Sequence, residues 1–246
     1  MLIIFSLPIM FSFTRTLVCD KRSTSIFYAY SYELKSVTAQ IVVICIKTFS
    51  PFVIHTTFPI IIAFLFCNLC LRCSSSYNCL TRKILRYSSE EFGPEEQIAI
   101  LKQKGKFDDI LDNIQDIFSL PSFLVITSNL LSCCNVMGIN LNDINSDRRV
   151  ISVLFYGIPN LLSLIAILWT AGGLLVEQHK LKEAFYKTVH SRFLIVHSLE
   201  EPQCIREILD KPDLVLNGCN ILFYTRSSIL AVFGTLLTYT LLVYQN

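Results

Sequence analysis

The chain has 246 residues, of which 52% are hydrophobic and only 16% are charged. A soluble globular domain is expected to have about 25% charged residues, so the composition argues against one. The formal net charge is +2 and no basic patch with interleaved aromatic residues occurs, so no nucleic-acid partner is expected. The sequence also lacks the motifs of soluble enzymes, such as G-x-S-x-G, a phosphate-binding loop or H-E-x-x-H. We therefore expect no enzyme and no cofactor.

Residues 1–40 begin with a short apolar run over residues 2–19, which Pro8 and Arg15 interrupt. Two interpretations stay open for residues 1–19. A signal peptide would have such an apolar core, but it would normally carry Lys or Arg before it, and none is present. The remnant of a membrane helix is the favoured interpretation. Residues 1–40 are thus predicted to form a partial first span followed by a polar outer loop.

Residues 41–246 contain four long runs without Asp, Glu, Lys or Arg, at 48–71, 117–142, 150–176 and 227–246. About 20 apolar residues in a helix span a hydrocarbon core about 30 Å thick. The fold class predicted is therefore all-α, a polytopic transmembrane helix bundle with spans at about 41–71, 117–141, 150–176 and 227–245. The first of these contains Lys47, Pro51 and Pro59, which predict a kinked or tilted helix.

The segments between the spans also carry helical patterns. Apolar residues recur at helical spacing from Ile98 to Ile117, which predicts an amphipathic helix. The span 150–176 is expected to continue as a charged helix to about residue 197. Residues 142–149 are predicted to form a tight turn, and residues 200–220 another polar-amphipathic segment broken at prolines. The bundle is therefore expected to have long helical extensions beyond the membrane.

The distribution of Lys and Arg predicts the topology. Loops 72–116 and 174–219 hold seven and six of these residues, whereas the turn 142–149 holds two and the loop 20–40 three. Because cytoplasmic loops carry the excess of positive charge, both long loops are predicted to be cytoplasmic. This places the helical extensions in the cytoplasm and the C-terminus outside, in a multi-pass protein of the plasma membrane.

The ten cysteines are spread along the chain, and several lie within apolar runs, where Cys behaves as a small hydrophobic residue. Cys67, Cys70 and Cys73 form C-x-x-C-x-x-C at a predicted membrane boundary, but the fourth ligand of an iron–sulfur cluster is missing. S-palmitoylation of Cys70 or Cys73 is the alternative to inert packing. His190 and His197 share a helix face without a third ligand, so no metal site is expected.

Two further sets of polar residues invite functional interpretations. The triplet Asp147-Arg148-Arg149 is similar to that of G-protein-coupled receptors, but it lies in a turn assigned to the outside, so the two arginines are interpreted as interfacial anchors. Lys47 and His55 are polar groups at membrane depth, which are functional candidates by default. Lys47 is expected to snorkel to the outer interface, and His55 is the better pocket candidate.

The final span has two distinct faces on a helical wheel centred on Thr238. One face is small and polar; it carries Ser227, Ala231, Gly234, Thr235, Thr238, Leu241, Leu242 and Gln245. The opposite face is bulky and apolar; it carries Ile229, Val232, Phe233, Leu236, Thr240, Val243 and Tyr244. Small residues suit close packing between helices, whereas a polar face suits a water-filled pore. Both interpretations stay open on the wheel alone.

The same span carries a family pattern. Thr238-Tyr239, five residues and then Gln245 resembles the Thr-Tyr-(five hydrophobic)-Gln-Phe ending of arthropod gustatory receptors. Gly218, Phe223, Arg226 and Leu230 are placed as in the family's run into its last helix. The order of the upstream segments, with a Leu/Ile-rich helix and a proline after a long loop, is also similar. The resemblance covers residues 40–246.

This resemblance implies a chemosensory receptor subunit with a ligand-gated, non-selective cation channel, which assembles as a homo- or hetero-oligomer, expected to be a tetramer, in membrane lipid. It implies that the last helices surround the pore, with Gln245, Leu242, Leu241 and Thr238 lining it and Tyr239 packing against neighbouring helices. A small-molecule tastant is expected to bind among the earlier helices. The pocket candidates share an aromatic or polar side chain in the outer half of the spans: His55, Phe52, Asn135, Phe155 and Tyr156.

Two features depart from the family pattern. Asn246 stands where the terminal Phe is expected, and only four or five of the seven spans are present. We therefore expect a fragment, an incompletely defined gene or a degenerate copy. The alternatives to a channel subunit are a transporter, a structural membrane subunit, and a truncated receptor without function.

Overall fold

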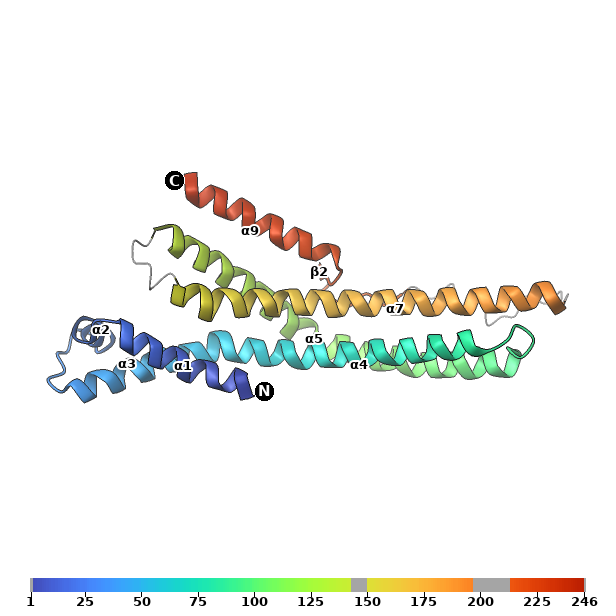
Figure 1. Cartoon of the computed structure of the whole chain (residues 1–246), viewed down its shortest axis with the longest axis horizontal. Coiled ribbons are helices and arrows are strands. Elements are labelled where there is room, and N and C mark those ends of the chain that lie inside the picture. Colours follow the sequence, from blue (N-terminus) through green and yellow to red (C-terminus); the bar gives the residue numbers. More distant parts are fainter. Residues whose placement is uncertain (1, 143–149, 197–212, 246) are drawn as a thin grey trace. The chain divides into compact units, whose positions relative to one another are not determined.

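The computed structural model describes residues 2–142, 150–196 and 213–245, and these are almost entirely helical. The chain runs through helices α1 (Leu2–Val18), α2 (Lys21–Tyr28), α3 (Val37–Phe52), α4 (Phe58–Arg86), α5 (Pro94–Asn142), α7 (Ile158–Val196) and α9 (Ser227–Gln245) (Figure 1). Two short π-helical segments, η1 (Val53–Thr57) and η2 (Val153–Gly157), precede α4 and α7. Strands β1 (Asn217–Gly218) and β2 (Leu222–Phe223) form a short antiparallel hairpin.

Four helical segments are long and apolar enough to cross a membrane: Val37–Arg86, Pro94–Gly138, Val150–Leu194 and Arg226–Gln245. Three of them contain a predicted span and Pro94–Gly138 covers most of the span predicted at 117–141, so the all-α fold class is confirmed. Such apolar helices indicate a protein embedded in a membrane. The helix α1, with 17 residues, covers the weaker apolar run at the N-terminus.

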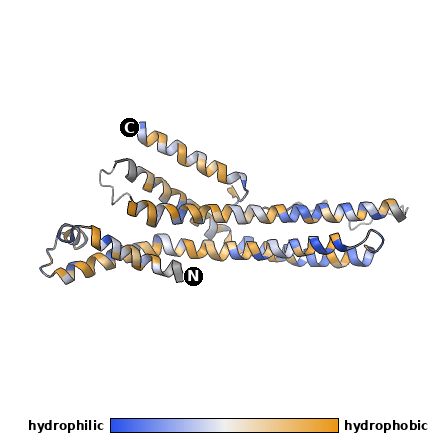
Figure 2. Ribbon diagram, viewed as in Figure 1, coloured by the Kyte–Doolittle hydropathy of each residue, from blue (hydrophilic) through white to orange (hydrophobic). Residues whose placement is uncertain are grey.

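The helices continue well beyond the apolar runs. Helix α4 extends to Arg86, α5 starts at Pro94, and α7 reaches Val196. The hydrophilic residues of these three helices gather where α4 ends, α5 begins and α7 ends (Figure 2). The predicted helical extensions are therefore present, and their cytoplasmic placement stays a prediction. The predicted turn 142–149 with its Asp-Arg-Arg triplet, His197 and most of the segment 200–220 lie outside the described residues.

The chain divides into two compact units. Unit 1 comprises Met1–Phe64, Leu124–Ile165 and Ala231–Asn246, and unit 2 comprises Leu65–Phe123 and Ala166–Leu230. Because α4, α5, α7 and α9 each pass from one unit into the other, neither unit is a continuous stretch of sequence.

Unit 2 is a three-helix arrangement with a buried polar centre. The Tyr77 hydroxyl on α4 donates a hydrogen bond of 2.8 Å to Asp108 on α5, and Lys104 donates one of 2.6 Å to the same carboxylate. The side chains of Lys104 and Asp108 are each only 10% exposed. A buried charge without a partner costs several kcal/mol, so this carboxylate fixes α4 against α5 in one register. Phe92, in the connection between α4 and α5, packs edge-on against Phe185 of α7, with ring centroids 5.5 Å apart.

The hairpin of unit 2 is attached to α5 by side-chain hydrogen bonds. The Gln115 amide accepts from the Asn217 backbone N–H at 2.9 Å and donates to the Asn217 carbonyl at 2.9 Å. The buried Tyr224 hydroxyl shares a hydrogen bond of 2.7 Å with Ser122. Burial raises the pKa of Tyr224 to about 12, so this phenol is neutral at physiological pH. These bonds fix the point at which the chain enters α9.

Gly218 is required for the close approach of the hairpin to α5. A Cβ atom at this position would overlap the Tyr224 hydroxyl and lie 2.8 Å from the Phe123 Cβ atom. Neither neighbour can move freely, because Phe123 belongs to the helix and Tyr224 is fully buried.

We expect Gly218→Ala to lower the free energy of unfolding by about 1–3 kcal/mol, because the added methyl group overpacks a closed contact. Thermal unfolding of the detergent-solubilised protein, followed by circular dichroism, measures the change. Gly105→Ala is the matched control, because a Cβ on Gly105 meets nothing within 4 Å. Equal stability of the two variants would contradict the packing described here.

Candidate functional site

Two π-helical turns interrupt the helices of unit 1, and both precede a proline in the same way. η1 is followed by Phe58 and Pro59, and η2 by Ile158 and Pro159. A proline has no N–H for the carbonyl four residues earlier and its ring pushes that carbonyl away, so the helix widens by one residue. The backbone N–H groups of Phe58 and Ile158 accordingly bond to the carbonyls five residues before them. The structure thus has a π-turn next to Pro59, within the span whose prolines predicted a kinked or tilted helix.

The π-turns contain three of the predicted pocket residues: His55 in η1, and Phe155 and Tyr156 in η2. Single π-turns in α-helices occur often at functional sites, because they re-aim side chains. The two turns therefore mark the part of unit 1 where a ligand site is most plausible on geometric grounds.

A hollow of about 480 Å³ opens beside these turns. Three of the predicted residues, His55, Asn135 and Tyr156, lie in its wall. The other lining residues are Ser128, Leu131, Ser132, Val136 and Ser152. Six of the eight lining side chains carry hydrogen-bonding groups, which is unusual for a cavity among apolar helices and fits a small ligand with several polar groups.

The other two pocket candidates, Phe52 and Phe155, are buried in the core of unit 1. Phe52 stacks on Phe11 with ring centroids 4.6 Å apart, and Phe155 lies 5.5 Å from Phe11. With Ile151 they form one hydrophobic cluster. The structure thus separates the five predicted residues into three that line the hollow and two that support the helices around it.

Sequence reasoning missed the serines of the hollow. Ser128, Ser132 and Asn135 are spaced i, i+4 and i+7, so they share one face of α5. That spacing within an apolar span was the signal that could have found them.

A ladder of buried amides joins α5 to α7 next to this face. The Asn129 amide donates to the Ser163 hydroxyl at 3.0 Å, and the Asn160 amide donates to the Ser132 hydroxyl at 2.6 Å. Both asparagines are fully buried. Hydrogen bonds of this kind replace the hydrophobic effect as the force between helices in a bilayer. They hold the two walls of the hollow together.

Part of the bulky face of the final helix, α9, is packed, and Phe233 and Tyr244 on that face expose 46% and 78% of their surface. Leu236 is only 3% exposed, and the Thr240 hydroxyl donates to the Met137 sulfur on α5 at 3.1 Å. Tyr239 is half-buried, and a Cβ atom on Gly138 would lie 3.3 Å from its hydroxyl. Tyr239 therefore lies against α5, as its predicted packing role requires.

The predicted pore-lining residues lie on the exposed face of α9. Thr238, Leu241, Leu242 and Gln245 are all exposed, and Leu241 and Leu242 expose 54% and 57% of their surface. The small and polar stripe is thus exposed in the described part of the chain.

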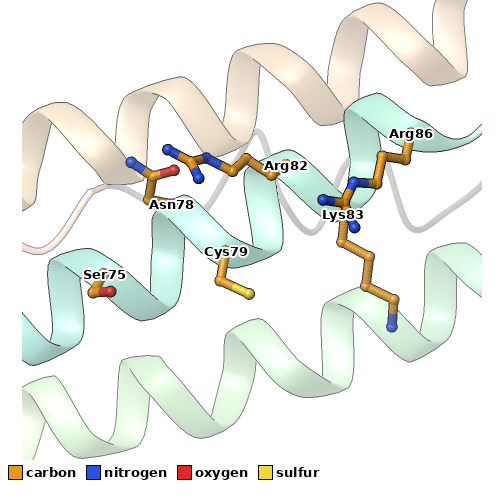
Figure 3. A pocket seen from close by; sticks show the side chains of 6 residues that line it. All are labelled: Ser75, Asn78, Cys79, Arg82, Lys83 and Arg86. Carbon is orange, nitrogen blue, oxygen red and sulfur yellow. The ribbon is translucent and has the colours of Figure 1, made fainter.

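Of the palmitoylation candidates, Cys70 is fully buried and Cys73 is half-buried. Cys79, which sequence reasoning did not single out, is exposed. It lies on α4 beside Arg82, Lys83 and Arg86 in a basic hollow of about 570 Å³ (Figure 3). Basic side chains in the last turns of a helix are stabilised by its dipole, so this cluster is explained as the solvated, positively charged end of α4.

Among the residues that the structure describes, no group of three or more His, Cys, Asp or Glu side chains is placed to hold a metal ion. His190 instead stacks on Tyr186, with ring centroids 5.7 Å apart.

No protein-family profile matches the chain, and no curated protein matches it in a sequence search. The resemblance to arthropod gustatory receptors therefore rests on the Thr238-Tyr239 and Gln245 pattern and on the order of the segments before it.

The buried hydrogen bonds between α5 and α7 predict that Asn160 contributes to stability and that Asn135 does not. We expect Asn160→Ala to destabilise the protein by about 1 kcal/mol, because the bond to Ser132 is lost between two membrane helices. Asn135→Ala, an exposed position of the same hollow, should leave stability unchanged. Thermal unfolding in matched detergent compares the two. A loss of stability in Asn135→Ala equal to that in Asn160→Ala would contradict the distinction between wall and support.

Proposed function

We propose that the chain is a chemosensory receptor subunit of the gustatory type, which opens a non-selective cation pore when a small molecule binds. The observation that carries this proposal is the orientation of α9. On one side of α9, Leu236 is buried and Thr240 contacts the chain's own α5, while the stripe with Thr238, Leu241, Leu242 and Gln245 is exposed. An unpaired amide in lipid costs several kcal/mol, so Gln245 needs water, headgroups or a partner subunit.

A pore at the centre of an oligomer satisfies this need. Thr238 and Gln245 are seven residues apart, so they point within about 20° of each other along one helix face. In the proposed assembly, which is expected to be a tetramer, Gln245 lies at the outer mouth and Thr238 deeper on the same stripe. Leu241 and Leu242 lie between them and form a hydrophobic constriction that closes the pore by dewetting.

The hollow beside η1 and η2 is the proposed ligand site. It combines the His55 imidazole, the Asn135 amide and the Tyr156 hydroxyl with three serines, so it can exchange hydrogen bonds with a polar tastant. Ligand binding there would bias the packing of α5, which also carries the contact with α9 through Met137. Helix α5 would thus couple ligand binding to the position of α9, which lines the proposed pore.

A second candidate function is a transporter or structural membrane subunit in which α9 serves packing alone. The small residues Ala231 and Gly234 on the exposed stripe favour it, because small residues allow the close approach of another helix. A truncated receptor without activity of its own is the further alternative. Ligand-evoked current without coupled substrate uptake distinguishes a channel from a transporter.

The topology of the proposed receptor is testable directly. With both long loops in the cytoplasm and the C-terminus outside, glycosylation-acceptor tags near residues 100 and 185 should stay unmodified, because only luminal or extracellular sites are glycosylated. A tag appended after residue 246 should be modified. Gel mobility with and without glycosidase reads out each tag. Modification near residue 100 or 185 would contradict the assignment.

The pore is tested by cysteine substitution along 234–245 in expressing cells, with a charged thiol reagent applied from outside. We expect block of ligand-evoked current at positions 238 and 245, which face the pore, and little effect at 236, 240 and 243. Positions 236, 240 and 243 are the matched controls because they lie on the packed or half-buried face of α9. The chain without substitutions, which has its own cysteines, sets the background. Equal effects around the helix, or none, would leave α9 as a packing helix.

A further inference from the structure

A second hollow lies in unit 1, built from four separate parts of the chain. Its volume is about 300 Å³, and its walls come from α1, α2, α3 and the segment 151–156. Arg15 on α1 and Lys47 on α3 both line it, together with the aromatic side chains of Phe11, Tyr28 and Tyr156. Apart from Tyr156 and Ser152, which also face the first hollow, its residues are distinct from the site proposed above.

Among the described residues of unit 1, no carboxylate forms an ion pair with either cation of this hollow. Within the described part of unit 1 the only carboxylates are those of Asp20 and Glu33. Asp20 caps α2 by accepting from the Ser23 backbone N–H, and Glu33 accepts from Arg22. Both acids are thus engaged elsewhere.

The surroundings of the cations are aromatic. The Lys47 ammonium lies 5.3 Å from the centre of the Tyr30 ring, and Arg15 lines the hollow together with Tyr156. Phe11 meets Tyr156 edge-on at 5.1 Å between ring centroids. The Lys47 side chain is exposed and Arg15 is half-buried, and two cations that line one hollow beside aromatic walls suit a bound anion.

We propose that this hollow binds a small organic carboxylate with an aromatic or short apolar body. The carboxylate lies between the Arg15 guanidinium, which suits two parallel hydrogen bonds, and the Lys47 ammonium. The apolar body lies against Phe11, Tyr28 and Tyr156. The proposal goes beyond the function above and does not depend on it, because binding can be measured without current.

The size and the walls of the hollow decide between anions. A phospholipid could place only its headgroup in about 300 Å³, with its acyl chains in the surrounding bilayer, so displacement by phosphatidylserine is part of the test below. Inorganic phosphate would leave the aromatic walls without a partner. A carboxylate attached to a ring uses the cations and the aromatic walls together.

The test uses benzoate as the probe and the full chain in nanodiscs of phosphatidylcholine, with binding measured by saturation-transfer NMR and isothermal titration. Benzoate should bind, and benzamide, its neutral isostere, should not. Arg15→Gln and Lys47→Gln should each weaken binding about tenfold or more, because each removes a charge-assisted hydrogen bond. Arg15→Lys, which keeps the charge but not the planar fork, should give a smaller loss and guards against misfolding as the cause.

Lys21→Gln is the matched control, since Lys21 is an exposed cation of the same unit that does not line the hollow. It should leave benzoate binding unchanged. Two outcomes would overturn the proposal. These are equal binding of benzamide, and displacement of benzoate by inorganic phosphate or by phosphatidylserine in the nanodisc.

Discussion

The structure depends on one constraint, which is that polar groups surrounded by hydrocarbon must find partners within the protein. The backbone meets it by forming helices long enough to cross a membrane, four of which are present among the described residues. Side chains meet it by pairing across helices, as Asn129 does with Ser163 and Asn160 with Ser132. The two regions that depart from this constraint, the proline-containing turns and α9, are the regions proposed to bind a ligand or another subunit.

The prolines are the first such departure. Pro59 and Pro159 each remove one backbone donor from a membrane helix, and in both cases the helix widens into a π-turn. His55 and Tyr156 lie in these turns and face the same hollow. A sequence feature that weakens the helix locally is thus also the feature that places polar side chains beside a cavity. The proposed ligand site thus lies where the two prolines interrupt the regular α-helical hydrogen bonding.

The second departure lies in α9. Its polar stripe is exposed in the described part of the chain, whereas on the other side Leu236 is buried and Thr240 contacts α5. For a monomer in lipid this arrangement is the reverse of what the bilayer favours. It becomes favourable when several copies gather with their stripes facing a shared, wetted axis, which is why the oligomeric pore is the proposed function.

The number and approximate limits of the apolar spans were determined by the sequence alone, because helix formation and hydropathy are local properties of consecutive residues. The stripe from Thr238 to Gln245 was equally visible, since a helical wheel needs only the spacing of residues along one helix. The charged continuation of α7 beyond residue 176 followed from the same local reasoning.

Only the tertiary structure decided which side chains meet. Phe52 and Phe155 have the same aromatic character as Tyr156, yet they pack into a core with Phe11 while Tyr156 lines a hollow. Arg15 and Lys47 lie on different helices, and nothing in their local sequence places them in one cavity. Gln115 and Asn217 are 102 residues apart, and their hydrogen bonds exist only because α5 and the hairpin pack together. Contacts of this kind depend on how segments distant in sequence pack, and local periodicity carries no information about that packing.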